Sequence, residues 1–292
     1  MIRTEIVNEY VKTLKYGENK SEHTIRNYMR NVNEFLDWLE ENEMEIEDVK
    51  SKDIKIFRSL REMSKSSMNL RINAVNHFFN FLVEDMEMLD KNPCDKVKSL
   101  KIRDKVEEQP LTKKQIYSLI DNCKNIRDKC IIEMLVNTGL RISELINVTL
   151  SDFENAKQND GELLILGKGS KLRTIYLNDE LMNDLDKYIE IRKESDDDNL
   201  FISNYNHKMD ASCINRTLKT IAKRSGMFTD EEANKIHNHL LRHTYTTIAI
   251  ESDIPLEVVS KTLGHSSTNI TYQVYLHQSK NRIKETMKNF KI

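Results

Sequence analysis

The sequence is short of the residues that make turns, with only 7 Gly and 3 Pro among 292 residues. Architectures built from many strands and long loops depend on turns, and turns depend on these two residues. An all-β protein is therefore disfavoured. Apolar residues recur instead at intervals of three and four, which is the period of amphipathic helices. We predict a mainly α-helical protein that carries a small β-hairpin or sheet.

Long apolar runs are lacking as well. No stretch approaches the roughly 18 uncharged apolar residues that a membrane span needs, and the N-terminus has no apolar segment typical of a secretory signal. The cysteines are widely spaced, form no C-x-x-C pair and suit a reducing compartment: Cys94, Cys123, Cys130 and Cys213. We expect a soluble, cytoplasmic protein with no membrane partner.

No sign of charge prevails, since the net charge is -2. Residues 1–100 contain 16 Lys and Arg against 19 Asp and Glu, and residues 101–292 contain 29 against 28. A protein of this balance binds nucleic acid only if its basic side chains gather on one face. The composition permits DNA binding without indicating it, so the motifs must decide.

The first hundred residues predict a helical bundle. Apolar periodicity indicates helices near residues 2–14, 21–39, 51–60 and 67–84. Ser21 or Thr24 would begin the second, and Ser51 or Asp53 would cap the third. In the fourth we expect Leu70 in the core, and we expect the polar face to carry Arg71, Asn73 and Asn76.

A basic segment framed by Pro93 and Pro110 follows the bundle. Its basic residues are Lys96, Lys98, Lys101, Arg103 and Lys105. Such a segment is either a solvated linker or a linker that follows DNA. Both readings place a domain boundary here. We predict an N-terminal domain over 1–98, a linker over 99–110 and a second domain over 111–292.

The second domain predicts helices around a single hairpin. Thr112 with Gln115 three residues later is a capping-box pattern. Helices are expected at 113–123, 126–137, 141–148, 179–193, 210–225, 240–251 and 255–263. Between 162 and 177 the period changes to two around a Gly-Lys-Gly-Ser turn, which predicts a β-hairpin with Lys168 at its tip.

Four separate segments carry groups that could bind a phosphate. Arg141 begins a predicted helix and offers a planar fork that Glu144, one turn later, could hold in place; an ordinary surface ion pair is the alternative. Lys168 between two glycines projects from the hairpin, which by itself is a weak signal. The motif H-N-H-L-L-R-H places His239 and Arg242 on one helical face.

The same motif and the fourth segment allow other interpretations. His239 and His243 have the spacing of a zinc-binding helix, but Leu240 replaces the glutamate of H-E-x-x-H and no third ligand is evident. A zinc hydrolase is therefore disfavoured, and we expect neither metal nor cofactor. The fourth segment is L-G-H-S-S, containing His265, followed by two tyrosines that could pack or react, Tyr272 and Tyr275.

Taken in chain order, these motifs resemble the tyrosine recombinase, or phage integrase, family. They are T-G-L-R-I-S-E-L at 138–145, G-K-G at 167–169, H-x-L-R-H-T at 239–244, L-G-H-S-S at 263–267 and Y-x-H at 275–277. Segments 24–39 and 71–82 resemble the family's core-binding domain more loosely. The resemblance implies an N-terminal helical DNA-binding domain of SAM-like type and a C-terminal mixed α catalytic domain.

The resemblance also implies a reaction and roles for single residues. A tyrosine attacks a DNA phosphate and forms a 3′-phosphotyrosine, which needs no metal or nucleotide. By resemblance, Arg141 and Arg242 clamp the phosphate, Lys168 protonates the leaving oxygen, His239 is the general acid–base, His265 donates to the phosphate, Glu144 orients Arg141, and His243 supports packing. Tyr275, ten residues after His265, is favoured as nucleophile over Tyr272.

The expected partner is double-stranded DNA with paired core sites, and not a small molecule. We expect DNA contacts from Thr24, Arg26, Arg71, Asn73, Lys171 and Arg173. The resemblance implies a homo-oligomer on DNA, a tetrameric synapse, in which the tail 278–292 docks on a neighbouring protomer; packing on its own protomer is the alternative. Asp253 stands where the family commonly has glycine, which puts that turn in question.

The implied role is integration and excision of a mobile element, or resolution of DNA dimers. Two other interpretations stay open. A type IB topoisomerase shares the tyrosine and arginine chemistry but relaxes supercoils as a monomer. A DNA-binding accessory protein with an inactive site is less compatible with the complete set of chemical groups.

Overall fold

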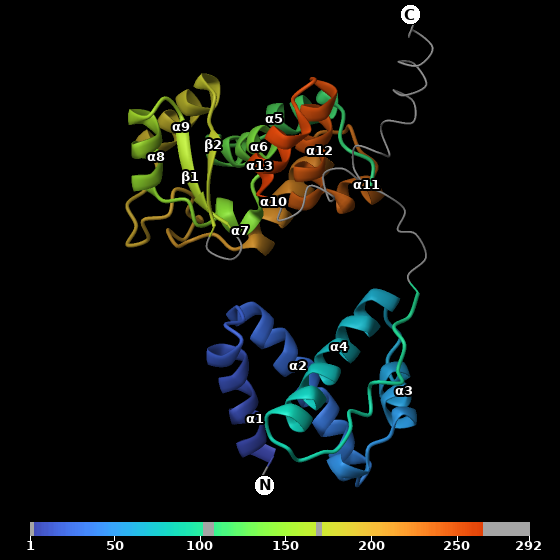
Figure 1. Ribbon diagram of the computed structural model, residues 1–292. Coiled ribbons are helices and arrows are strands. Elements are labelled where there is room, and N and C mark those ends of the chain that lie inside the picture. The colour runs from blue at the N-terminus through green and yellow to red at the C-terminus, as the bar shows by residue number, and fades with distance from the viewer. Residues whose placement is uncertain (1–2, 102–107, 168–170, 265–292) are drawn as a thin grey trace, which may run out of the picture. The chain divides into compact units, whose positions relative to one another are not determined.

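The chain divides into two compact units, Met1–Val106 and Glu107–Ile292. The computed structural model describes residues 3–101, 108–167 and 171–264. Both units are built of helices, and the second also contains one two-stranded hairpin (Figure 1). The prediction of a mainly α-helical fold with a small β component is confirmed. No helix among the described residues has the length and apolarity to cross a membrane.

The described part of the N-terminal unit, residues 3–101, is a bundle of four α-helices. They are α1 (Arg3–Lys12), which continues into a π-helical turn (Thr13–Gly17), α2 (Glu22–Glu41), α3 (Ser51–Ser59) after a 3₁₀ turn (Ile46–Asp48), and α4 (Lys65–Glu84). Ser21 and Ser64 cap α2 and α4 with their side chains. Helices α2 and α4 pack against each other around an aromatic core, in which the ring of Phe35 meets those of Phe57 and Phe79 edge-on.

Helix α4 corrects two expectations about its faces. Leu70 is 65% exposed, whereas Arg71 is only 3% exposed. The guanidinium of Arg71 lies 3.8 Å from the centre of the Phe57 ring and 3.2 Å from the carboxylate of Glu34. The cause is helical geometry, because Arg71 shares the inward face with Val75, four residues later, and Leu70 is turned about 100° away from it. Arg71 is thus not a surface residue that could contact DNA.

The second unit holds the remaining elements. They are α5 (Lys113–Asp121), α6 (Ile126–Thr138), α7 (Ile142–Leu145), α8 (Leu150–Gln158), β1 (Glu162–Leu166), β2 (Leu172–Tyr176), α9 (Asp179–Ile191), α10 (Ala211–Arg224), α11 (Asp230–Lys235), α12 (Asn238–Glu251) and α13 (Leu256–Leu263). The two strands pair antiparallel from Glu162↔Tyr176 to Leu166↔Leu172. The capping box of Thr112 and Gln115 forms as predicted.

Two helices were not predicted, and one is shorter than expected. Each missed helix buries little: α8 buries Phe153 and Ala156, and α11 buries Ala233. So few apolar residues leave no periodic signal. Both begin with a capping box, from Thr149 and Thr229, which is the signal that could have revealed them. The helix expected over 141–148 is reduced to the single turn of α7.

Helix α6 organises the second unit, because α5, α9 and α12 all pack against it. It ends at Gly139, which adopts the left-handed conformation with φ of 64°. A Cβ at this glycine would lie 2.4 Å from a ring carbon of Tyr245 on α12 and 2.8 Å from Leu263 at the end of α13. The ends of α6 and α13 therefore meet at a position that only glycine fits.

The turn between α12 and α13 accommodates the departure at Asp253. Its φ is 61°, the left-handed conformation that glycine favours and that aspartate tolerates better than most residues. The backbone N–H of Asp253 donates to the carbonyl of Ile250, and that of Ile254 donates to Ala249. The replacement thus leaves the turn closed, and α13 follows directly.

Replacing Gly139 with alanine should destabilise the second unit. We expect Gly139→Ala to lower its free energy of unfolding by about 3 kcal/mol, of which roughly 1 comes from the left-handed backbone and the rest from overpacking against Tyr245 and Leu263. Gly226 is the matched control, because its φ is also 64° and a Cβ there meets nothing within 4 Å. Gly226→Ala should lose only about 1 kcal/mol. Thermal unfolding of both variants measures the difference, and equal losses would contradict the packing argument.

Candidate active site

Three arginines converge on the last carbonyls of helix α13. The carbonyl oxygens of residues 262–264 accept, in order, hydrogen bonds from Arg173 Nε at 2.7 Å, Arg242 Nη2 at 2.7 Å and Arg141 Nη2 at 3.5 Å. The final carbonyls of a helix have no partner within it and carry partial negative charge. This helix end therefore collects cations that originate from three different parts of the second unit.

Arg242 links the ends of two helices. It projects from α12, is 8% exposed, and also donates Nη1 to the carbonyl of Gly139 at 2.5 Å. Burial lowers the pKa of Arg242 to about 10, and the positive charge of Arg141 adds to this effect. At neutral pH the group still carries its charge. Arg141 and Arg242, which we predicted to share a site, bind adjacent carbonyls at the end of α13.

Glu144 orients Arg141 at the start of α7. Its carboxylate accepts from the backbone N–H of Arg141 at 2.8 Å and from Arg141 Nη1 at 2.9 Å. The Glu144 side chain is 4% exposed, and that of Arg141 is 28% exposed. Because the carboxylate is buried and bound twice by the same residue, the pair is more than the surface ion pair that the sequence left open.

Arg173 is a member of the cluster that the sequence placed elsewhere. Its two Nη atoms donate to the two oxygens of Glu144 at 2.8 and 2.7 Å, and its side chain is 8% exposed. We expected it to contact DNA, whereas here its donors bind a carboxylate of the protein itself. The strand alternation could have shown it, because Arg173 pairs with buried Ile165 and lies two residues before buried Ile175.

His239 lies on α12, one turn before Arg242. It is among the exposed residues, yet partial desolvation of its imidazole lowers its pKa below the ordinary value of 6.5, with further lowering from His237, Arg242 and Arg141. His243, one turn later, is half-buried. Within residues 3–101, 108–167 and 171–264, no three His, Cys, Asp or Glu side chains group closely enough to hold a metal ion.

The other candidate residues lie outside the described residues: Lys168, His265, Tyr272, Tyr275 and the tail 278–292. The glycines that precede Lys168 and His265 are described, and both lie against Arg173. A Cβ at Gly167 would be 3.1 Å from Arg173 Nη1, and one at Gly264 would be 3.0 Å from its Cδ. Lys168 and His265 therefore each follow, in the sequence, a glycine that lies against Arg173.

The remaining DNA-contact candidates occupy exposed or partly exposed positions. In the N-terminal unit, Thr24 hydrogen-bonds Ser21 at the start of α2, and Arg26 and Asn73 are exposed. In the second unit, Lys171 is exposed beside the hairpin turn. Their contacts with DNA stay predictions.

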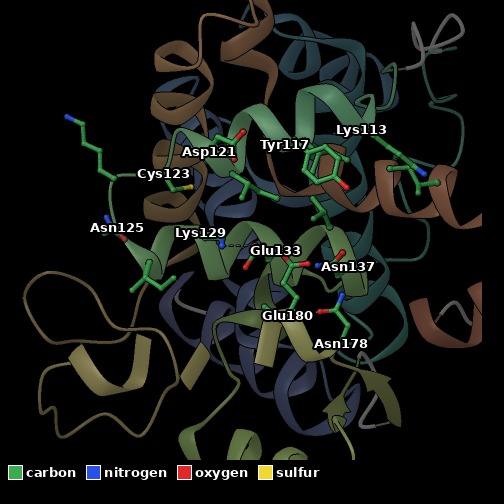
Figure 2. Close-up of a pocket in the computed structure, with 17 residues that line it drawn as sticks. Lys113, Tyr117, Asp121, Cys123, Asn125, Lys129, Glu133, Asn137, Asn178 and Glu180 are labelled. Atoms are coloured by element: carbon green, nitrogen blue, oxygen red, sulfur yellow. Dashed lines mark hydrogen bonds and ion pairs between the residues drawn. The ribbon is translucent and has the colours of Figure 1, made fainter. Parts of the chain in front are cut away.

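A cavity in the second unit lies apart from the arginine cluster. It has a volume of about 760 Å³ and is bordered by α5, α6 and the start of α9. Figure 2 shows Glu133, Asn137 and Asn178 among the residues lining it. No arginine of the cluster lines this cavity. We therefore take the arginine cluster, and not this cavity, as the candidate active site.

Family models match residues in both units of the chain. The model of the phage integrase family matches residues 109–282, and that of the phage integrase N-terminal SAM-like domain matches residues 7–85. A tyrosine recombinase of Pseudothermotoga lettingae is 30% identical, over 93% of this chain and 93% of its own length. Tyrosine recombinase XerC of Leptospira interrogans is 28% identical, over 96% and 91%.

Solved structures show the same fold. A lambda integrase dimer bound to a core site is similar with a TM-score of 0.73 and 20% identity, covering 92% of this chain and 97% of that one. The XerA recombinase is 25% identical with a TM-score of 0.54, and each chain is fully covered. The family model covers more than half of the sequence. The chain therefore belongs to the phage integrase family and is a tyrosine recombinase, an enzyme that breaks and rejoins DNA strands.

Proposed function

We propose that this enzyme is a site-specific recombinase that joins Tyr275 to a DNA phosphate as a 3′-phosphotyrosine intermediate. The observation that carries the proposal is the convergence of Arg141 and Arg242 on the end of α13. The chain continues from that helix end directly into the segment with His265 and Tyr275. Cations held at a fixed place suit phosphoryl transfer, and the candidate nucleophile follows this helix end in the sequence.

The two arginines would stabilise the transition state. Phosphoryl transfer places negative charge on the non-bridging oxygens, and donors that are already oriented stabilise it without reorganisation. Arg242 is oriented by two carbonyls and Arg141 by Glu144. Arg141 is the more accessible of the two, with 28% of its side chain exposed. We assign both to the clamp around the phosphate, with His265 as an additional donor.

Proton transfers would fall to His239 and Lys168. The Tyr275 oxygen forms a bond to phosphorus while the bond from phosphorus to the 5′ oxygen breaks. A phenol has an ordinary pKa near 10, so it needs a base at neutral pH. The lowered pKa of His239 keeps its imidazole neutral and able to accept that proton. Lys168 would give a proton to the leaving 5′ oxygen. The 3′-phosphotyrosine keeps the energy of the broken DNA bond, so rejoining the strand needs no nucleotide cofactor.

We assign the parts of the chain accordingly. Residues 1–98 would bind core DNA through Thr24, Arg26 and Asn73, residues 99–110 would link the domains, and residues 111–292 would catalyse the reaction, with Lys171 contacting DNA. Lambda integrase, a protein of similar fold, has been crystallised as a dimer on a core site. By analogy we propose paired core sites and a tetramer, in which the tail 278–292 docks on a neighbouring protomer.

The same reaction would serve integration and excision of a mobile element or resolution of DNA dimers. We expect the enzyme to act in the cytoplasm, where its DNA substrate would be. A type IB topoisomerase would form the same covalent bond but relax a plasmid without a second site. Recombinant products that require two sites distinguish the two functions.

Changing Tyr275 should abolish the covalent intermediate. A nicked suicide DNA substrate that traps the adduct is incubated with the enzyme in the presence of a chelator. The wild type and Tyr272→Phe should form a protein–DNA adduct. Tyr275→Phe should form none, because it lacks the phenolic oxygen that bonds to phosphorus. An adduct that survives Tyr275→Phe, or that needs a metal ion, would overturn the assignment. A wild type that binds DNA without any adduct would indicate an inactive accessory protein.

The rate of adduct formation should depend on the neutral form of His239. Because its pKa lies below 6.5, the base form should persist in mildly acidic solution, and the rate should decline only as the pH falls below about 6.5. Single-turnover rates between about pH 5 and about pH 8 test this. His239→Gln should be slower and should lack this decline. A decline that begins well above pH 6.5, or one that His239→Gln retains, would assign the titration to another group.

A further inference from the structure

We propose that Arg173 is a positioning residue of strand cleavage, which fixes Glu144 so that Arg141 is presented to the phosphate. The proposal rests on the proposed function. Arg173 would act through Glu144 and through the end of α13, without touching the DNA. This role differs from the DNA contact that we expected from the sequence.

The hydrogen bonds of the Glu144 carboxylate are divided equally between two arginines. Oε1 accepts from Arg173 Nη1 at 2.8 Å and from Arg141 Nη1 at 2.9 Å. Oε2 accepts from Arg173 Nη2 at 2.7 Å and from the backbone N–H of Arg141 at 2.8 Å. Two acceptor sites on each oxygen are thus satisfied, so the carboxylate has one orientation. Without Arg173, half of these bonds would be lost from a buried group.

Arg173 also preserves the positive charge of the site. Without Arg173, the carboxylate of Glu144 would offset one of the two charges of Arg141 and Arg242, whereas with Arg173 two net positive charges remain. Burial tends to raise the pKa of Glu144, but the hydrogen bonds from Arg173, and then those from Arg141, outweigh it and hold that pKa below its usual range. Glu144 therefore stays ionised, as the orientation of Arg141 requires.

The third donor of Arg173 ties the site to the rest of the unit. Nε donates to the carbonyl of Thr262 at 2.7 Å. Gly167, which precedes Lys168, and Gly264, which precedes His265, both lie so close to the side chain that an added Cβ would fall 3.1 and 3.0 Å from it. One planar group therefore contacts the hairpin turn, the start of α7 and the end of α13. A lysine has no rigid fork and cannot reproduce these contacts.

The burial of Arg173 distinguishes it from a residue that binds DNA directly. Its side chain is 8% exposed, against 28% for Arg141. Its donors are directed at a carboxylate and a carbonyl of the protein itself. A residue in this position affects the rate at which bound DNA is cleaved more than it affects DNA binding.

The test separates cleavage rate from affinity. Single-turnover adduct formation on the nicked suicide substrate, at saturating protein, is measured for Arg173→Gln, Glu144→Gln and the double variant, with the Kd for the same DNA. We expect each single variant to be slower by about 10²-fold with little change in Kd. The double variant should be no slower than the slower single variant, because both act through one contact. Lys157→Gln, which removes an exposed ion pair with Asp186, is the matched control.

The pH dependence provides a signature that general destabilisation would not produce. In Arg173→Gln, burial should raise the pKa of Glu144, so the rate relative to wild type should fall further as the pH is lowered through the range where that carboxyl takes up a proton. The double variant has no carboxyl at this position and should lack the additional fall. The pKa itself can be followed by NMR of the side-chain carboxyl carbon, without reference to activity.

The possible outcomes distinguish this proposal from the broader one. A weaker Kd with an unchanged rate at saturation would make Arg173 a DNA contact. Independent effects in the double variant, or a Glu144 pKa unchanged in Arg173→Gln, would likewise overturn the proposal.

If Arg173→Gln fails to fold, Arg173→Lys, which keeps the charge, is used for the same measurements and should lose about 10-fold in rate. Absence of a Tyr275-dependent adduct in the wild type would instead refute the proposed function, while the NMR measurement would still test the link to Glu144.

Discussion

The last carbonyls of helix α13, which a helix leaves without partners of its own, are the feature on which the site depends. Three guanidinium groups repel one another, and they stay together only where negative charge compensates them. The helix end supplies partial charge through its last carbonyls, and Glu144 supplies a full charge. Because these partners belong to the protein, the cations are assembled before any substrate arrives.

The rest of the second unit brings distant parts of the chain to this point. Helix α6 ends there because Gly139 permits the left-handed turn and the close approach of Tyr245 and Leu263. Its last carbonyl is bound by Arg242, so α6 and α13 are connected by a charged side chain as well as by packing. The hairpin contributes Arg173 from its inward face. Together these parts gather three arginines at one helix end.

Much of this could be inferred from sequence, because certain signals are local. The helices with strong apolar periodicity, the hairpin with its glycine turn, and the pairing of Arg141 with Glu144 all depend on residues within a few positions of one another. The helices α8 and α11 were missed because they bury too little to produce a period. Arg71 and Arg173 were misplaced because charge was taken as a sign of exposure. In both cases the helical or strand period pointed inward, and a carboxylate, half-buried Glu34 or buried Glu144, compensated the charge.

The sequence alone determined the family, the type of fold and the order of the chemical groups, since motifs and periodicity are written along the chain. It could not determine which cations share a carboxylate or which carbonyls they bind. Those contacts join residues such as Arg173 and Thr262, or Arg242 and Gly139, that are about 90 and 100 positions apart. Only the packed helices and hairpin bring them within hydrogen-bonding distance, and the charge of each group is compensated only there.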